Sequence, residues 1–315
     1  MSRRHFAVVK LANKGKTNKK TLPACRLPGG RIIKFAFTGL NRFDLWRGLL
    51  KIPMSNGKKR LKFMIEKARP YQQLAILYDT VMEHVNYKQW ARYVLALIDK
   101  YGAGKQTVCD LACGTGSLLP YLAGRKRRVV GCDLSLSMLR RAKEKFSGQN
   151  VPLICADFRA VPLTESVCDA AVILYDSINY LHSGEEILNL FGEAARILKP
   201  GGVLVFDAVL PYVCREVFDG YEDVRFLSSD LGYRRQSWFD RQEGVQYNRF
   251  QIYANGQVFE ELHRQRIWTL SEWREIIEKN RSLNLQAIHG DFTFRNVRPK
   301  SERAHFVLRK PGNSA

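Results

Sequence analysis

The sequence lacks several features that mark membrane, secreted and metal-binding proteins. No apolar run reaches the ~18 residues that a membrane span needs, and the basic N-terminus has no apolar core segment that would make it a signal peptide. The seven cysteines include no C-x-x-C pair, so the spacing typical of a zinc or iron–sulfur site is missing. We therefore expect a cytoplasmic protein without a membrane partner or a bound metal, whose cysteines are small buried hydrophobes.

Acidic residues are scarce in the first part of the chain. Residues 1–69 hold 19 Lys and Arg but only Asp44 and Glu66, whereas residues 70–315 hold 32 basic and 28 acidic residues. The net charge of +21 therefore resides mostly in this N-terminal segment, and only this segment argues for a polyanionic partner such as RNA. Most of it shows no sustained period. It fits a disordered basic tail, an organelle-targeting leader, or a start codon placed upstream of a true start at Met54.

One stretch, from Thr107 to Ser135, has the order strand, turn, helix, strand. Apolar runs at 107–111 and 129–132 predict two short buried strands, and the apolar period at 118–123 predicts the helix between them. The turn carries glycines at 114 and 116, which lack a Cβ and so permit a sharp bend and the close approach of a ligand to the backbone. This order is the first half of a nucleotide-binding α/β unit.

Two carboxylates indicate which nucleotide the unit fits. Asp133, at the end of the second strand, can accept hydrogen bonds from both ribose hydroxyls of an adenosine. Asp110, just before the turn, would repel a pyrophosphate but suits a cationic amino group. Leu119 stands where a dinucleotide fingerprint has its third glycine. The residues therefore favour S-adenosylmethionine, an adenosine that carries a positively charged amino-acid tail.

Three segments resemble a known family. VCDLACGTG is similar to the first motif of class I S-adenosylmethionine-dependent methyltransferases, VVGCDLS to their second, and LKPGGVLVFD to a later one, and the likeness covers roughly residues 71–310. The resemblance implies an α/β fold with a doubly wound, seven-stranded, mostly parallel Rossmann-like sheet. An N-terminal helical cap and an inserted antiparallel β hairpin layer complete it, as in small-molecule N-methyltransferases with such a lid.

The pattern along the chain divides it into four parts. We expect a basic extension at 1–69, cap helices and the cofactor-binding core at 70–209, an inserted antiparallel lid at 210–267, and the completion of the core at 268–315. The lid is predicted from alternating residues around an Asn255-Gly256 turn, and Ser271 is the expected N-cap of the helix that follows. In similar methyltransferases such an insert often forms a dimer surface, so a homodimer is one expected assembly.

The resemblance assigns cofactor-binding roles to residues that match the family's motifs. Tyr78 would close over the methionine tail, and Met138 would pack on the adenine or ribose. Asp157 would accept from the adenine amine, while the next backbone N–H reaches the ring. The structural alternatives are a core aromatic for Tyr78, a core methionine for Met138, and a helix N-cap or a surface acid for Asp157. The predicted set is Tyr78, Asp110, Ala112, Gly114, Gly116, Asp133, Leu134, Met138, Asp157, Phe158 and Tyr175.

The loop after the fourth core strand is where cofactor and substrate should meet, because ligands of doubly wound sheets bind off the carboxyl ends of the strands. Its sequence, YDSINYL, departs from the Asn/Asp-Pro-Pro-Tyr/Phe motif of enzymes that methylate nucleic-acid base amines, which argues against that chemistry. Catalytic roles are predicted for Tyr175, Asp176 and His182, and substrate contacts for Asn179, Tyr180, His263 and Arg266. A solvated strand face is the alternative for the last two.

These observations lead to competing hypotheses about function. The first is an S-adenosylmethionine-dependent methyltransferase that modifies a nitrogen or oxygen of a small molecule, with His182 or His263 as a base. The second is an RNA-modifying methyltransferase tethered by the basic N-terminus. The third is a partner-binding protein that keeps the cofactor fold without turnover. A nicotinamide-dependent reductase fits worst, because the third glycine of its fingerprint is missing and Asp110 is present.

Overall fold

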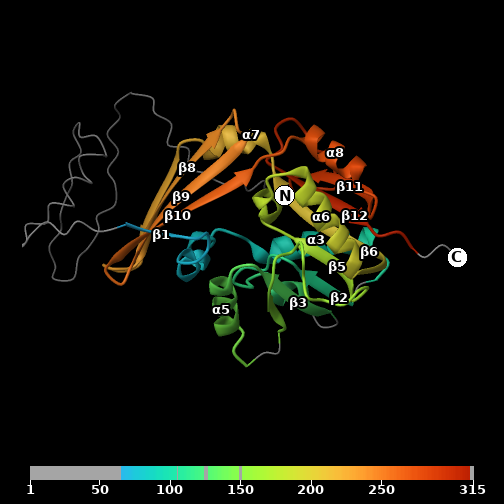
Figure 1. Cartoon of the computed structure of the whole chain (residues 1–315), viewed down its shortest axis with the longest axis horizontal. Helices are drawn as coiled ribbons and strands as arrows, with labels where there is room; N and C mark the ends of the chain where they lie inside the picture. The colour runs from blue at the N-terminus through green and yellow to red at the C-terminus, as the bar shows by residue number, and fades with distance from the viewer. Residues whose placement is uncertain (1–64, 105, 124–126, 149–150, 313–315) are drawn as a thin grey trace, which may run out of the picture. The chain divides into compact units, whose positions relative to one another are not determined.

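The computed structural model describes residues 65–104, 106–123, 127–148 and 151–312. The strands in these ranges form two sheets, one of seven strands and one of five (Figure 1). Residues 1–64, which make up most of the expected basic extension, lie outside the described residues. Within the described part of the chain, no helix is both long and apolar enough to cross a membrane.

The seven-stranded sheet has the order β11-β12-β6-β5-β2-β3-β4. Its parallel strands are β4 (Leu153–Cys155), β3 (Arg128–Asp133), β2 (Thr107–Asp110), β5 (Cys168–Ile173) and β6 (Leu198–Val209). The last two strands, β11 (Asn284–Gly290) and β12 (Arg303–Arg309), form an antiparallel pair, and β12 also runs antiparallel to β6. The strand order reverses between β2 and β5, so a ligand crevice is expected at the carboxyl ends of these strands.

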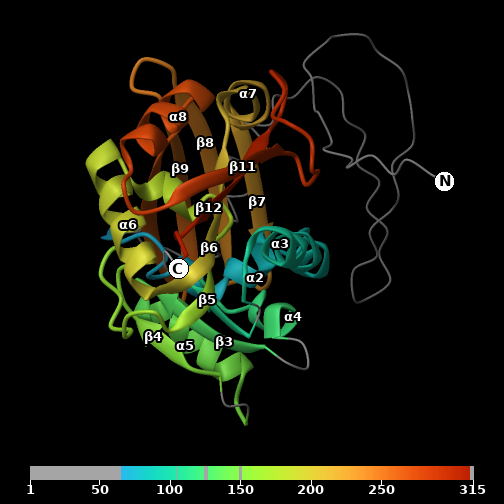
Figure 2. The same cartoon turned by 90° about the vertical axis from the view of Figure 1, so that its right-hand side faces the viewer.

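Helices cover both faces of this sheet (Figure 2). On one face, α3 (Tyr87–Tyr101), α4 (Leu119–Ala123) and α5 (Leu136–Lys145) pack on strand residues such as Val108 and Val205. On the other face, α6 (Gly184–Ile197) and α8 (Leu270–Lys279) pack on Cys109, Leu204 and Phe206. Successive strand residues point to opposite faces of the sheet, and helices cover both faces. Most residues of the central strands are therefore buried, which explains why these strands are continuous apolar runs in the sequence. The predicted fold class is confirmed.

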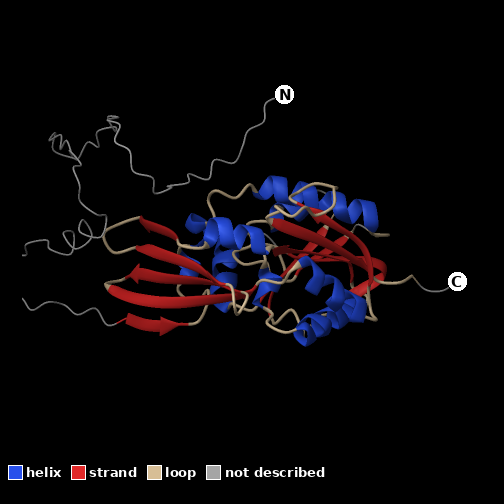
Figure 3. Cartoon of the chain, turned by 90° about the horizontal axis from the view of Figure 1, so that it is seen from above, coloured by secondary structure: helices blue, strands red, loops and turns tan. Residues whose placement is uncertain are grey.

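Four of the five strands of the second sheet lie in the chain between β6 and α8, and Figure 3 shows this sheet as a set of strands separate from the first. After the short helices α7 (Pro211–Val213) and η3 (Cys214–Phe218) come four antiparallel strands: β7 (Tyr221–Phe226), β8 (Gly232–Asp240), β9 (Val245–Ala254) and β10 (Gln257–Arg266). Both turn residues between β9 and β10 have positive φ, 52° at Asn255 and 72° at Gly256. That geometry matches the tight hairpin turn predicted from the Asn-Gly pair.

The fifth strand of this sheet, β1 (Ile65–Ala68), was not predicted. It lies within the segment 1–69 that the sequence assigned to the extension, yet it pairs in parallel with β10. From β1 the chain passes through a strap, which we define as residues 69–77, into the cap helices. The strap contains η1 (Leu74–Ile76), and α2 (Tyr78–Val81) follows it. β1 has only four residues, and they are mostly exposed, so its sequence shows no alternation of buried and exposed positions that would indicate a strand. Its pairing with β10 makes it a strand instead.

Two local expectations were wrong. The N-cap of α8 is Thr269 rather than Ser271, because the Thr269 hydroxyl accepts from the Glu272 N–H at 3.2 Å. The Glu272 carboxylate in turn accepts from the Thr269 N–H at 2.7 Å, which completes a capping box. Cys155 is exposed, whereas the other described cysteines are buried, as expected for small hydrophobes: Cys109, Cys113, Cys132, Cys168 and Cys214.

Candidate active site

The turn between β2 and α4 depends on its two glycines. Gly114 and Gly116 have φ of +57° and +73°, a region that other residues rarely adopt. A Cβ on Gly116 would lie 2.6 Å from the Phe146 ring. A Cβ on Gly114 would instead point toward Met138 and Tyr78, at 3.2 and 3.9 Å from their nearest atoms. Gly114 therefore opens the backbone toward two residues that the sequence assigned to cofactor binding.

Asp133 joins this turn to the end of β3. One carboxylate oxygen accepts the Gly114 N–H at 2.8 Å, and the other accepts the Ser135 N–H at 2.8 Å. Each oxygen keeps a second lone pair, so both can still accept from the paired hydroxyls of a ribose. The side chain of Met138 is buried nearby, whereas Leu134, also in the predicted set, is 70% exposed.

Asp110 adds a second carboxyl next to Asp133. It is buried, and among the described residues its carboxylate accepts one hydrogen bond, from the Ala112 N–H at 3.2 Å. Burial, with a smaller effect of the Asp133 charge, raises the pKa of Asp110 to about 7. Two neighbouring carboxyls, one of them short of donors, fit a cationic ligand group. The residues present therefore fit S-adenosylmethionine, with Asp133 for the ribose and Asp110 for the cationic tail.

Asp157 follows β4 and already has a strong partner. Arg159 binds its carboxylate through two nitrogens, at 3.0 and 2.7 Å, and also reaches Glu186 at 2.6 Å. These hydrogen bonds from Arg159 lower the pKa of Asp157. The predicted contact with an adenine amine would have to share the carboxylate with this guanidinium. Phe158, the next residue, is partly buried against the apolar cluster beneath α6 and α8.

The loop after β5 is strained at the point where the site residues begin. Tyr175 and Asp176 both have positive φ, 57° and 52°, which is unfavourable for residues with a Cβ and persists only where surrounding contacts enforce it. The Tyr175 ring lies on Trp90, with centroids 4.1 Å apart. Its hydroxyl is buried without a hydrogen-bond partner among the described residues, and burial raises its pKa above the usual range.

Asp176 is held by two other strands. One carboxylate oxygen accepts from Arg303 of β12 at 2.8 Å, and the other accepts from Gln265 of β10 at 2.6 Å. Arg303 also pairs with Asp207, which is fully buried at the end of β6, and its guanidinium lies 5.4 Å from the Trp90 ring centroid. Burial raises the pKa of Asp207 to about 6 against the opposing charge of Arg303. These contacts fix the Asp176 side chain within the loop after β5.

Three other predicted residues have structural partners or lie apart. The amide of Asn179, which is fully buried, donates to the Arg266 carbonyl at 2.7 Å and accepts from the Val209 N–H at 3.2 Å. The Arg266 guanidinium binds Glu272 at 2.9 Å and two backbone carbonyls of the β8–β9 turn. His182 is exposed at the start of α6. The structure does not bring these three side chains to the carboxylates of the cofactor crevice.

Tyr180 and His263, by contrast, are brought together. The Tyr180 hydroxyl lies 2.7 Å from Nδ1 of His263, although the two residues are 83 positions apart. Two residues that the sequence reasoning missed complete this group: Tyr71 of the strap and Glu261 of β10. Glu261 and His263 alternate with the exposed Leu262, so the period of β10 could have indicated that both face inward.

The cap is fastened directly to the glycine turn. Asp79 of α2 accepts from the hydroxyls of Thr115 and Ser117, at 2.6 and 3.1 Å, and pairs with Lys145 of α5 at 2.9 Å. The hydrogen bonds and the ion pair together lower the pKa of Asp79, against the effect of burial. This network places Tyr78, the neighbour of Asp79, over the turn.

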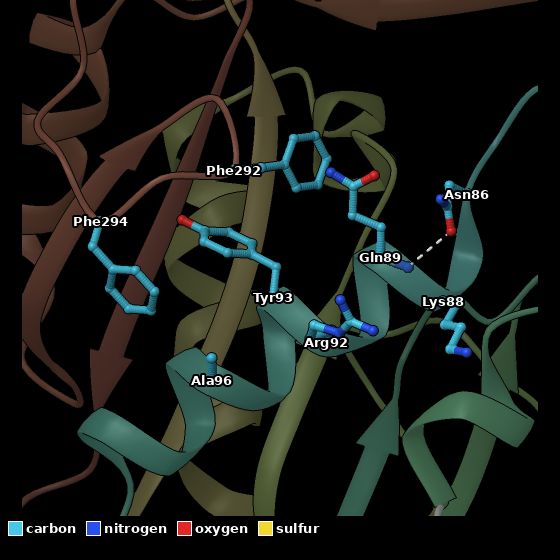
Figure 4. A pocket seen from close by; sticks show the side chains of 8 residues that line it. All are labelled: Asn86, Lys88, Gln89, Arg92, Tyr93, Ala96, Phe292 and Phe294. Atoms are coloured by element: carbon cyan, nitrogen blue, oxygen red, sulfur yellow. Dashed lines mark hydrogen bonds between the residues drawn. The ribbon is translucent and has the colours of Figure 1, made fainter. Parts of the chain in front are cut away.

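A separate groove of about 480 Å³ lies along α3, and Figure 4 shows the side chains that line it. It is formed by the first turns of α3 and the loop between β11 and β12, and it contains none of the predicted site residues. Its lining residues are Asn86, Lys88, Gln89, Arg92, Tyr93, Ala96, Phe292 and Phe294. The candidate site is therefore defined by the residues at the strand ends and not by this groove.

Known proteins share both the sequence and the fold. A family model described as a methyltransferase domain matches residues 108–202. The protein named "Putative methyltransferase YqeM" of Bacillus subtilis (strain 168) is 34% identical over 247 residues, which cover 76% of this chain and 97% of that protein.

Two solved structures have the same fold. An S-adenosylmethionine-dependent methyltransferase from Clostridium acetobutylicum has a TM-score of 0.64 at 23% identity, covering 76% of this chain and 98% of that one. The sugar N-methyltransferase KedS8 from Streptoalloteichus has a TM-score of 0.62 at 21% identity, covering 82% and 99%. With the residues at the strand ends described above, these likenesses lead to one conclusion: the chain belongs to the family of class I S-adenosylmethionine-dependent methyltransferases.

Proposed function

We propose that this methyltransferase acts on a nitrogen or oxygen atom of a small molecule. The observation that carries the proposal is the meeting of three separate segments beside the cofactor crevice. Tyr180 of the loop after β5 lies within hydrogen-bond distance of both Tyr71 of the strap and His263 of β10, and the rings of Tyr71 and His263 meet edge-on. A substrate there would be enclosed by the cap and the inserted sheet, as suits a small molecule. The sugar N-methyltransferase with this fold is in keeping with that substrate class.

The demands on the chain's own side chains are modest. S-adenosylmethionine supplies a methyl group that its sulfonium already activates. Asp133 and Asp110 would bind the ribose and the cationic tail, while Tyr78 and Met138 would enclose the cofactor and exclude water. Asp176, held by Arg303 and Gln265, would keep the loop after β5 in place. Binding and orientation, rather than strong acid–base chemistry, then account for most of the catalysis.

A direct assay tests this substrate class. The full chain is incubated with S-adenosylmethionine and, in separate reactions, an amino sugar, an aliphatic diamine, a phenol and total tRNA. We expect S-adenosylhomocysteine to accumulate with at least one small acceptor, whose mass increases by one methyl group less one proton. Methylation of tRNA alone would contradict the proposal. The variant Asp133→Ala controls for turnover by a contaminating enzyme.

RNA is a second candidate substrate because of charge. Residues 1–69 contain 19 Lys and Arg against two acidic residues, and phosphate contacts by such a segment would bind RNA without regard to sequence. The enzyme would then be an RNA-modifying methyltransferase tethered by its N-terminal extension. The tRNA reaction in the same assay distinguishes this candidate from the first.

We also propose a second copy of the chain as a partner, through the edge of the inserted sheet. β7 is the last strand of that sheet, and it exposes Tyr221, Val224 and Phe226, at 37%, 44% and 47%. An edge strand with apolar side chains is a template for pairing with another strand. Light scattering after size-exclusion chromatography should give the mass of a dimer, and Phe226→Lys should reduce it to that of a monomer. A monomeric wild-type chain would contradict this assembly.

A further inference from the structure

Four side chains form a continuous hydrogen-bonded row beside the cofactor crevice. Nε2 of His263 lies 3.1 Å from the Glu261 carboxylate, and its Nδ1 lies 2.7 Å from the Tyr180 hydroxyl. The Tyr180 hydroxyl lies 2.8 Å from the Tyr71 hydroxyl. Glu261 is 0% exposed and His263 is 2% exposed, so water does not mediate these contacts from outside. A buried acid, an imidazole and two hydroxyls in sequence can transfer a proton along the row.

The positions of the hydrogens follow from Glu261. Its two oxygens accept the backbone N–H groups of Tyr71, Gln73 and Leu74, at 2.8, 2.6 and 2.9 Å, in addition to His263. A carboxylate offers about four lone-pair sites, and three backbone N–H groups already donate to this one, which sets Glu261 as an acceptor toward His263 as well. Nε2 of His263 must therefore carry a hydrogen, which leaves Nδ1 as the acceptor. This assignment comes from the hydrogen-bond network.

The same logic orients both tyrosines. Because Nδ1 of His263 accepts, the Tyr180 hydroxyl donates to it, and the Tyr180 oxygen accepts from the Tyr71 hydroxyl. No hydrogen bond from another described residue reaches the Tyr71 oxygen, which leaves it a lone pair at the end of the row. Burial raises the pKa of both tyrosines above the usual range, so each stays a neutral hydroxyl that can pass a proton on without holding a charge.

Tyr71 connects this row to the cofactor residues. Its carbonyl accepts from the hydroxyl of Ser135, two residues after Asp133, at 3.1 Å. Its ring meets Tyr78 edge-on, with centroids 5.7 Å apart. Tyr71 also has a φ of +62°, which is a strained conformation for a bulky residue. The bonds from Glu261 and Ser135 hold it there, and strain of this kind collects at functional sites.

We propose that Tyr71, Tyr180, His263 and Glu261 form a proton relay that receives the proton released by the methyl acceptor. This inference rests on the proposed function, because a nitrogen or oxygen acceptor that carries a hydrogen releases a proton when it is methylated. Tyr71 is then the catalytic residue that touches the substrate. Tyr180 and His263 carry the proton onward, and Glu261 is a positioning residue that fixes the tautomer of His263.

The reaction balances as follows in atoms and charge. The acceptor's lone pair forms a bond to the methyl carbon, and the S–CH₃ bond breaks with its electron pair left on sulfur. The acceptor's proton passes to the Tyr71 oxygen, the Tyr71 proton to Tyr180, and the Tyr180 proton to Nδ1 of His263. Both hydroxyls are neutral again, and the positive charge rests on an imidazolium beside the Glu261 carboxylate. His263 later returns this proton to solvent as the products leave.

The first arm of the test does not depend on the substrate. The full chain, labelled with ¹⁵N-histidine and saturated with S-adenosylhomocysteine, is examined by NMR correlation of the imidazole nitrogens. We expect His263 to be neutral, with its hydrogen on Nε2. Tyr180→Phe should move the Nδ1 resonance toward that of an acceptor without a donor, and Glu261→Gln should release the fixed tautomer. A hydrogen on Nδ1 in the wild-type chain would overturn the relay.

The second arm separates the relay from the proposed function. With the small acceptor that the wild-type chain methylates, Tyr71→Phe and Tyr180→Phe should lower kcat by about 100-fold, the lower end for proton-transfer catalysis, while KM and the affinity for S-adenosylhomocysteine stay unchanged. Tyr247→Phe is the matched control, since that hydroxyl donates to Glu243 of the β8–β9 turn. Wild-type kcat in both tyrosine variants would overturn the relay alone. Absence of any small-molecule turnover in the wild-type chain would overturn the proposed function, and the NMR arm would then decide the relay.

Discussion

Asp110 is a buried carboxyl whose proton should depend on the ligand beside it. Its pKa of about 7 in the free protein is raised mainly by burial. A cationic ligand group favours the ionised form, so binding below that pH must release a proton, and affinity must rise with pH. We expect the affinity for S-adenosylhomocysteine to increase by up to about tenfold per pH unit below about pH 7 and then to level off.

Calorimetry in two buffers of different ionisation enthalpy measures this released proton directly. Asp110→Asn should bind with an affinity that no longer follows the lower part of the pH profile. If the wild-type chain binds equally well over the whole range, then Asp110 does not face the cationic group, and its raised pKa reflects burial alone.

Asp133 is the residue on which cofactor affinity should depend most. Asp133→Ala removes the proposed acceptor for two ribose hydroxyls and also releases the Gly114 N–H. Hydrogen bonds to a charged group contribute about 1.5–3 kcal/mol each, so affinity for S-adenosylhomocysteine should fall by at least about tenfold. Calorimetric titration measures the loss, and Asp230→Asn, in the exposed β7–β8 loop, is the control. Unchanged binding would show that the ribose lies elsewhere.

The turn between β2 and α4 needs glycine for two reasons that can be tested separately: a positive φ and a lack of space for a Cβ. Gly116 has both a positive φ and a crowded Cβ position, whereas Gly148, with a φ of +85°, has open space around it. Gly148→Ala should lower the free energy of unfolding by about 1 kcal/mol through backbone strain alone. Gly116→Ala should lower it by about 2–4 kcal/mol, because the clash with Phe146 is added. Urea unfolding of both variants compares them, and equal losses would mean that Phe146 moves aside freely.

The helix α8 offers a second comparison at the scale of an element. Its capping box is built on Thr269 and Glu272, so Thr269→Ala should lower the free energy of unfolding by about 1 kcal/mol. Ser271→Ala, at the position that the sequence favoured, should change it by less than about 0.5 kcal/mol. The same unfolding measurement applies to both. A larger loss for Ser271→Ala would reverse the assignment of the cap.

For the whole molecule, the segment before the described residues should affect RNA and not the cofactor. A chain that begins at Met54 lacks most of the basic residues of the extension but keeps β1. We expect it to bind S-adenosylhomocysteine as the full chain does and to lose affinity for total tRNA. In the full chain, tRNA affinity should fall steeply with salt, because counterions are released at each phosphate contact. Titrations at several salt concentrations test this, and equal tRNA binding by both chains would exclude the extension as an RNA tether.

The sequence by itself determined those parts of this protein that are stabilised by interactions among neighbouring residues. The glycine turn, the acids at the strand ends, the apolar strands of the seven-stranded sheet and the Asn255-Gly256 hairpin were all visible, because each is encoded within a few residues by backbone freedom or period. The predicted substrate-contacting residues do not all lie together in the structure. Tyr180 and His263 meet, while Asn179 and Arg266 fasten the backbone.

Only the tertiary structure decided which distant side chains became partners. Glu261 accepts the Tyr71 N–H across 190 positions, and Arg303 reaches Asp176 across 127, because the folded chain brings these distant segments into contact. A buried acid or base has no local signature, since its stability depends on a donor or countercharge supplied by another element. The fold could therefore be predicted from the chain, whereas the row from Glu261 to Tyr71 emerged only in the assembled structure.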